Sequence, residues 1–318
     1  MGINVLGHQT TLRDRIEFSG VGVHSGKLVT MALLPADADM GVVFSVSDPA
    51  SNTTLDIPGN VNSVSSTDLC TVLGDPDGVF VATVEHLMAA LSAYGVDNVI
   101  VELDGAEVPV MDGSSHVFVE AIESVGLTSL AASRCYIRVK KPVRVDMGAS
   151  WGEFIPYDGT RFEVEIDFDS KAVGRQKFAS DMNADVFREE ISRARTFGFM
   201  KDVERLWAAG FALGSSLDNS VVIGDDDTII NPEGLRYKDE FVRHKTLDAI
   251  GDLALSGAQF LGCFRSYRGG HKLNSLVLRK LLSEKDAFEF VGSPLSKPSV
   301  HHGELVAMSA PAYAANLV

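Results

Sequence analysis

Polar residues recur at helical spacing inside one otherwise apolar segment, residues 240–253. With about 3.6 residues per turn, His244, Asp248 and Asp252 fall on one stripe of a helix, and apolar side chains lie on both sides of that stripe. An imidazole and a carboxylate four residues apart are suitable ligands for a divalent metal ion. The alternative is an ordinary helix whose polar stripe faces water, and this segment taken alone does not separate the two.

A second segment, residues 82–91, places Glu85 and His86 side by side in an alanine- and leucine-rich sequence that favours helix, with Thr83 as its N-cap. Burying either polar side chain without a partner is costly, so both should have partners. Three protein ligands with an open fourth position are typical of catalytic zinc sites, which makes His86 a candidate third ligand. Glu85 would then be the nearby carboxylate that accepts a proton from water. The alternative is a glutamate paired with an arginine and a histidine satisfied in the core.

Short apolar stretches separated by turns surround these two helices, and their order is that of an α+β protein. A helix from about residue 84 is ended by Gly95, and a small, polar segment at 127–133 is the natural linker between two halves. The other predicted elements are strands at 15–18, 28–33, 41–46, 98–103, 135–139, 149–154 and 162–168, and helices at about 117–125 and 185–192.

The two halves of the chain echo each other. Residues 84–86 and the apolar positions after them can be laid over residues 242–244 and those after them. The match is short, and chance similarity is the alternative. If it reflects duplication, one helix from each half would meet at the domain interface, where pockets are commonly found. That would bring His86 to His244.

Composition narrows the functional classes. The 318 residues are 45% hydrophobic and 22% charged, which is typical of a globular protein. A net charge of -15 argues against nonspecific nucleic-acid binding, which needs basic surface. No apolar stretch is long enough to cross a bilayer, and the N-terminus lacks the regions of a signal peptide, so we expect a cytoplasmic protein. Cys70, Cys135 and Cys263 form no CxxC pair, and we expect reduced thiols.

Six motifs occur along the chain, at residues 20–26 (GVGVHSG), 83–86 (TVEH), 109–114 (PVMDGS), 192–199 (SRARTFGF), 239–252 (DEFVRHKTLDAIGD) and 269–271 (GGH). With them the chain resembles, from about Gln9 to about Phe290, the zinc-dependent UDP-3-O-acyl-N-acetylglucosamine deacetylases of lipid A biosynthesis. Several independent motifs in the right order make this resemblance specific.

The resemblance implies an α+β fold of two similar domains, each a β-sheet packed with α-helices, whose helix layers face each other around a zinc site. We expect the domains at residues 1–129 and 134–300, followed by a tail at 301–318. The implied Zn²⁺ ligands are His86, His244 and Asp248. The implied reaction removes the N-acetyl group and releases acetate.

The resemblance also assigns catalytic roles. Glu85 matches the general base, and His271 matches a second catalytic residue held as imidazolium by Asp252. Either Glu85 or His271 could protonate the leaving amine. Thr196 matches a hydroxyl that polarises the substrate carbonyl. The alternative for His271 is a histidine in a glycine-flanked surface loop.

Substrate contacts follow from the same resemblance. Lys245 matches a position directed toward phosphate and Phe168 one directed toward uracil; the alternatives are a solvated charge and a core residue. An insertion at about residues 199–222 matches the acyl-chain passage. The complete predicted substrate-binding set is Lys245, Phe168, Phe197, Leu69 and Gly270.

Some positions depart from the common family pattern and bear on substrate contacts rather than on the metal. They are residues 169–171 (DSK) in place of a His-Pro pair, Ser215 in place of a second glycine, and Asp68 in place of a methionine. We expect a monomer that acts on a UDP-linked acylated amino sugar, binds no nucleic acid and has no transmembrane segment; transient contact with a membrane surface stays open. The rival functions are a zinc deacetylase for another acylated sugar or nucleotide, and a non-catalytic binding protein.

Overall fold

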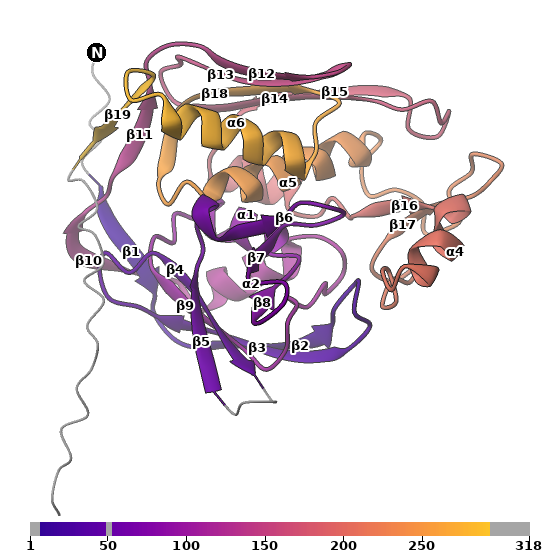
Figure 1. Cartoon of the computed structure of the whole chain (residues 1–318), viewed down its shortest axis with the longest axis horizontal. Helices are drawn as coiled ribbons and strands as arrows, with labels where there is room; N and C mark the ends of the chain where they lie inside the picture. The colour runs from indigo at the N-terminus through magenta and orange to yellow at the C-terminus, as the bar shows by residue number, and fades with distance from the viewer. Residues whose placement is uncertain (1–6, 49–52, 293–318) are drawn as a thin grey trace, which may run out of the picture.

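The computed structural model describes residues 7–48 and 53–292. The predicted tail at 301–318 and the last residues of the predicted second domain lie outside this range. The described part of the chain forms two large sheets with two layers of helices between them, and three smaller sheets (Figure 1). This arrangement confirms the predicted α+β class with facing helix layers, whereas the predicted domain boundaries stay a prediction.

The N-terminal sheet has five strands in the order β2-β3-β9-β4-β5. All of its pairings are antiparallel except that of β4 with β9, and helices α1 and α2 cover one face (Figure 1). Buried and exposed side chains alternate along β2 and β9, as expected for strands with one face on the core. The elements are β2(Ile16–Val21), β3(Leu28–Pro35), β4(Val42–Asp48), β5(Thr53–Pro58), α1(Glu85–Ala93), β9(Val99–Leu103) and α2(His116–Val125). A short turn η1(Val61–Ser63) leads into a small sheet of β6(Val64–Ser66), β7(Val72–Gly74) and β8(Phe80–Val81).

The C-terminal sheet has seven strands around the mostly buried β18. Alternation is clear in β14, where Phe162, Val164 and Ile166 are buried while Arg161 and Glu163 form an ion pair on the other face. Helices α5 and α6 pack on the inner face. The elements are β11(Tyr136–Val139), β12(Val143–Met147), β13(Ser150–Ile155), β14(Thr160–Asp167), β15(Arg175–Asp181), α5(Glu240–Ala254), β18(Gln259–Tyr267), α6(His271–Ser283) and β19(Phe288–Val291).

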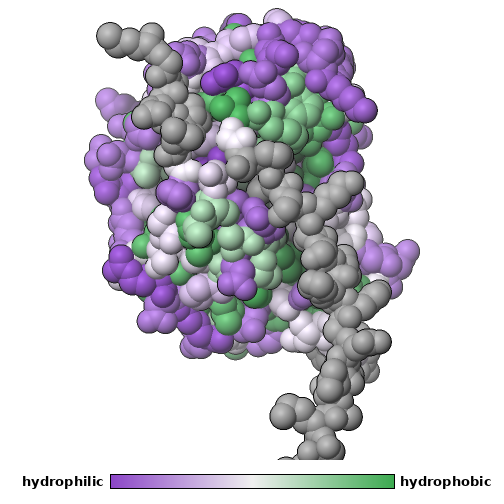
Figure 2. Space-filling model, turned by 90° about the vertical axis from the view of Figure 1, so that its left-hand side faces the viewer, coloured by the Kyte–Doolittle hydropathy of each residue, from purple (hydrophilic) through white to green (hydrophobic). Residues whose placement is uncertain are grey.

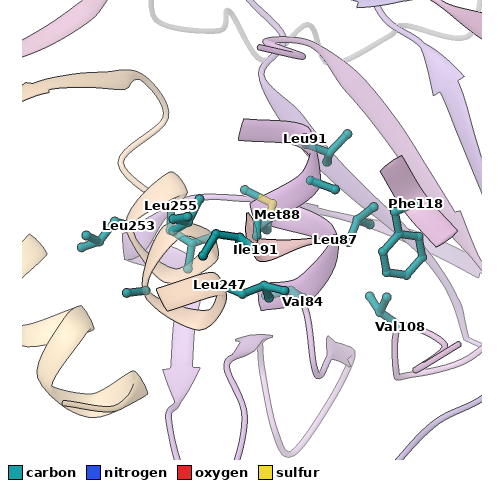
Figure 3. Close-up of a cluster of buried hydrophobic side chains, with 14 of the residues drawn as sticks. Val84, Leu87, Met88, Leu91, Val108, Phe118, Ile191, Leu247, Leu253 and Leu255 are labelled. Atoms are coloured by element: carbon teal, nitrogen blue, oxygen red, sulfur yellow. The ribbon is translucent and has the colours of Figure 1, made fainter. Parts of the chain in front are cut away.

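The two halves meet through α1 and α5, as the echo between them predicted. Figure 3 shows Met88 of α1 directed toward Leu255 and Val84 beside Leu247 of α5, while Leu87 of α1 turns toward Phe118 of α2. The helix backbones approach closely, because a Cβ built on Gly251 of α5 would lie 1.9 Å from the carbonyl oxygen of Glu85. A glycine at 251 is therefore needed to seat the start of α1 against the middle of α5.

The segment predicted to link the two halves forms a strand. β10(Leu127–Ser133) pairs antiparallel with β1(His8–Leu12), so the connection between the halves is tied to the N-terminal strand by main-chain hydrogen bonds. Its small, polar composition gave no sign of a strand, because a two-stranded ribbon near the surface needs little apolar content. Figure 2 faces this side of the molecule and shows hydrophobic and hydrophilic surface interspersed.

Three other local predictions can be compared with the structure. Gly95 ends α1 with a left-handed φ of 68°, as predicted. Thr83 is not the N-cap of α1; Val84 occupies that position, and Thr83 has a left-handed φ of 57°. The helix predicted at 185–192 is α3(Ala184–Val186) followed by a π-helical turn, η2(Phe187–Ile191).

The predicted insertion is a small parallel unit on the outside of the second half. It comprises β16(Phe197–Phe199), α4(Met200–Ala208) and β17(Val221–Ile223), with β16 paired to β17. None of the helices in the part of the chain that the structure describes is long and apolar enough to span a membrane. The three cysteines all lie in that part and form no disulfide, as expected.

Candidate active site

Three side chains from α1 and α5 form a buried cluster with the composition of a metal site. Potential ligand atoms of His86, His244 and Asp248 all lie within 4.8 Å of one another. Asp248 Oδ1 is 3.3 Å from His244 Nε2 and 3.6 Å from His86 Nε2. All three residues are at most 5% exposed, so the alternative of a polar stripe facing water is wrong.

The donor set fits a divalent cation. Asp248 Oδ1 is buried and accepts no hydrogen bond from the described residues, an arrangement that is costly unless a cation or a water molecule lies there. His244 Nδ1 lies 3.0 Å from the carbonyl oxygen of Ala194, which favours the tautomer whose Nε2 lone pair points into the cluster. The 3.3 Å and 3.6 Å separations are close to the roughly 3.3 Å expected between tetrahedral ligand atoms about 2.0 Å from a metal.

The protonation states also suit ligation. Burial lowers the pKa of His244 to about 3, so its imidazole is neutral at physiological pH. Burial opposes the charge of Asp248, but the Lys245 ammonium lowers its pKa well below the usual aspartate value. Because His244 is neutral, the positive charge beside Asp248 is that of Lys245. The Lys245 Nζ donates to Asp248 Oδ2 at 2.8 Å. This contact leaves Oδ1 directed at the two imidazoles.

Beside the cluster lie a buried carboxyl group and an imidazole. Glu85 is 3% exposed, and its Oε1 is 3.7 Å from His271 Nε2. His271 is the first residue of α6 and 9% exposed, so the alternative of a surface-loop histidine is wrong. Its Nδ1 lies 2.9 Å from Asp252 Oδ2, as the assignment of Asp252 predicted.

The pKa values of Glu85 and His271 are both raised above the ordinary values of these groups. Burial raises the pKa of Glu85 above the ordinary glutamate value, although the nearby His271 opposes this. Burial by itself would lower the pKa of His271, but the carboxylates of Asp252 and Glu85 outweigh it and raise that pKa to about 10. The site therefore holds a basic carboxylate next to a charged imidazole.

Two supporting residues were not predicted from the sequence. The Thr71 backbone N–H donates to Glu85 Oε2 at 3.1 Å, and its hydroxyl donates to Asp252 Oδ1 at 2.6 Å. Asn274 Nδ2 donates to Asp252 Oδ2 at 2.8 Å. Asn274 could have been found from its position three residues after His271 on one helix. Thr71 is 181 residues from Asp252 and left no sequence signal. Glu85 is thus held by Thr71 and His271, not by the arginine that the core alternative required.

Comparisons with known protein sequences agree with this geometry. A sequence model of the UDP-3-O-acyl N-acetylglycosamine deacetylase family matches residues 9–283. The chain belongs to this family. Proteins named UDP-3-O-acyl-N-acetylglucosamine deacetylase from Brucella ovis, Brucella canis and Brucella melitensis biotype 2 are each 58% identical to it over 284 residues, covering 89% of this chain and 98% of each relative. The family named from the motifs is therefore confirmed.

The residues predicted to bind substrate in this deacetylase lie at one side of the metal cluster. Phe197 stacks edge-on against His244, with ring centroids 6.2 Å apart, and Phe168 contacts Phe197 at 5.8 Å. Lys245 lies 5.8 Å from the Phe197 ring while also pairing with Asp248. This deacetylase therefore carries Lys245 at the rim of the metal cluster and not as a solvated charge.

The other predicted positions are distributed around the same deacetylase site. Thr196 is half-buried, directly before Phe197, and its N–H donates to the Gly113 carbonyl at 2.8 Å. Gly270 is the N-cap of α6, next to His271. Leu69 is 49% exposed and has a left-handed φ of 67°, two residues before Thr71. The roles of these residues toward substrate stay a prediction.

Proposed function

We propose that the chain hydrolyses the N-acetyl amide of UDP-3-O-acyl-N-acetylglucosamine, giving UDP-3-O-acyl-glucosamine and acetate in lipid A biosynthesis, and that His86, His244 and Asp248 hold a Zn²⁺ ion. The observation that carries this proposal is the three-ligand cluster with one orphaned carboxylate oxygen, flanked by a basic Glu85 and a charged His271. A non-catalytic binding protein would need neither a base nor a proton donor.

The chemistry of amide hydrolysis matches the side chains present. A bound Zn²⁺ would acidify a water molecule and polarise the amide carbonyl. Glu85 takes the proton from the attacking water, and its raised pKa suits that task. His271 remains protonated and stabilises the negative charge that develops on the amide oxygen, with help from the Thr196 hydroxyl. The leaving amine takes its proton from Glu85 or from His271.

Substrate binding follows the aromatic and basic side chains beside the cluster. We assign Phe168 to the uracil and Lys245 to the phosphates, with Phe197, Leu69 and Gly270 lining the sugar. The insertion between β16 and β17 would carry the acyl chain, since several of its apolar side chains face solvent. These are Met200, Trp207, Phe211, Leu213 and Leu217. We further propose a cytoplasmic monomer, which cell fractionation and sedimentation would test.

The deciding experiment measures metal content and acetate release together. Purified protein should contain about one zinc per chain and release acetate from the 3-O-acylated UDP sugar. Omitting the O-acyl chain should lower kcat/KM, because binding energy from that chain is lost. Equal rates with and without the chain would favour a deacetylase for another acetylated sugar, and no acetate from either substrate would exclude the proposed reaction.

The pairing of His271 with Asp252 predicts a pH effect. The pKa of His271 is raised to about 10, so its positive charge is present below that pH and is lost as pH rises through it. In Asp252→Asn the neighbouring negative charge is removed, the folded-state pKa falls, and the alkaline limb of the kcat/KM profile should move to lower pH by about one unit or more.

A matched control is Asp286→Asn, which removes an exposed carboxylate paired with Lys141 in the same half of the chain. That variant should leave the alkaline limb in place. An alkaline limb that does not move in Asp252→Asn would contradict the proposed role of the pair.

A further inference from the structure

Glu107 is a buried carboxylate that the proposed reaction does not use. It is 3% exposed, and its partners in the described part of the chain are hydrogen-bond donors, not a lysine or arginine. Oε1 accepts from the His24 N–H at 2.9 Å and from the Thr83 hydroxyl at 3.0 Å, while Oε2 accepts from the Ser25 N–H at 2.9 Å. Three donors from two separate turns therefore meet on one side chain.

The turn at residues 22–26 is built to admit this carboxylate. A Cβ on Gly22 would lie 2.1 Å from Glu107 Oε2, so any larger residue would push the carboxylate out. On its other side, Glu107 holds Thr83, whose left-handed backbone precedes α1 and Glu85 by two residues. Glu107 thus fastens the GVGVHSG motif to the turn that starts α1.

The same turn contacts the middle of the insertion, at residues 211–214. The Leu213 N–H donates to the His24 carbonyl at 3.1 Å, and the Gly214 N–H donates to the Val23 carbonyl at 3.0 Å. Phe211 packs edge-on against the His24 ring, with centroids 5.6 Å apart. A Cβ on Gly214 would lie 2.3 Å from the Gly22 carbonyl oxygen, so the two backbones are in direct contact.

We propose that Glu107 is a positioning residue for substrate binding, which sets the place of residues 211–214 through the turn at 22–26. This inference rests on the proposed function, because it takes the insertion as the acyl-binding element. Glu107 lies in the N-terminal half and the insertion in the C-terminal half, so one buried carboxylate registers the acyl-binding element against the half that carries Glu85.

Replacing Glu107 with glutamine removes the negative charge and one of the two acceptor oxygens while keeping the shape of the side chain. In Glu107→Gln the amide oxygen can still accept from His24 N–H and Thr83, but the amide nitrogen faces the Ser25 N–H, which leaves two donors opposed. The turn should loosen while Thr83 stays held. Glu85 keeps its contacts with Thr71 and His271, so the chemical step should be spared.

Kinetics with long-chain and short-chain 3-O-acyl substrates measure the effect. In Glu107→Gln, KM for the long-chain substrate should rise about 10-fold, with kcat within about 3-fold, and KM for the short-chain substrate should change far less. The control is Glu102→Gln, an exposed glutamate of β9 that pairs with Arg15. A KM that does not change for the long chain, or an equal change for both substrates, would overturn the positioning role.

Hydrogen exchange tests the same contact without catalysis. The amides of Leu213 and Gly214 should exchange at least about 3-fold faster in Glu107→Gln than in wild type. If the wild type released no acetate, the proposed function would fail, yet this exchange would still decide whether Glu107 holds the insertion; unchanged exchange refutes that. Should Glu107→Gln not fold, Gly22→Ala displaces the same carboxylate, because its Cβ would lie 2.1 Å from Glu107 Oε2. That variant should give the same dependence on chain length, whose absence would count against the proposal.

Discussion

Replacing Glu85 with glutamine is expected to lower kcat by at least about 100-fold while the protein keeps its metal. Glutamine has nearly the same shape, so the Thr71 N–H still finds an oxygen acceptor and α1 keeps its packing. The amide cannot take a proton, however, and the attacking water loses its base. The raised pKa of Glu85, caused mainly by burial, is the property that the substitution removes.

Steady-state rates and metal analysis of the same sample check this result. Glu120→Gln is a suitable control, because Glu120 lies on the solvent side of α2 with a largely exposed side chain. Near wild-type activity in Glu85→Gln would remove Glu85 from the base role. Loss of metal would instead show that Glu85 supports the ligand cluster.

Replacing His244 or Asp248 with alanine should abolish both tight metal binding and activity. Each change removes one of three ligand atoms. We expect the metal affinity to fall by more than about 100-fold, which is more than the usual loss when a residue that only hydrogen-bonds to a metal ligand is replaced. Asp248→Ala also leaves the Lys245 ammonium without its carboxylate, so that variant should unfold more readily than His244→Ala.

Elemental analysis after dialysis, together with acetate release, measures this effect. The control is His116→Ala, which removes a partly exposed histidine of α2 that pairs with Glu120 and lies outside the cluster. Full metal content in either ligand variant would show that the ion binds elsewhere. A normal metal content in the His116 variant is part of the same expectation.

The helices of the site were predictable because their chemistry is local. Residues 240–254 carry apolar positions around a polar stripe, and that period is a property of the segment alone. The end of α1 at Gly95 was predictable for the same reason, since a left-handed residue after a helix favours glycine. The start of α1 was not, because Thr83 donates its hydroxyl to Glu107, a partner from another part of the chain.

Strands were less predictable where their sequences do not alternate between apolar and polar residues. β15 contains Phe178 as its main buried apolar residue, and β10 consists mostly of small and polar residues. Both form because a neighbouring strand offers unpaired main-chain groups, β14 in one case and β1 in the other. Main-chain pairing leaves little trace in side-chain pattern.

The amino-acid pattern and the family motifs were sufficient to predict His86, His244 and Asp248 as metal ligands, and Glu85, His271 and Asp252 as the residues beside them. The division of the polar stripe of α5 between metal and imidazole came from the motifs, and the structure bears out its geometry. Only the tertiary structure decided how those groups are supported, by Thr71, Asn274, the Ala194 carbonyl and Lys245. The physical reason is that the helical period is a property of residues close together in the sequence. Each supporting contact instead depends on how packed helices and distant loops bring their atoms within hydrogen-bond distance.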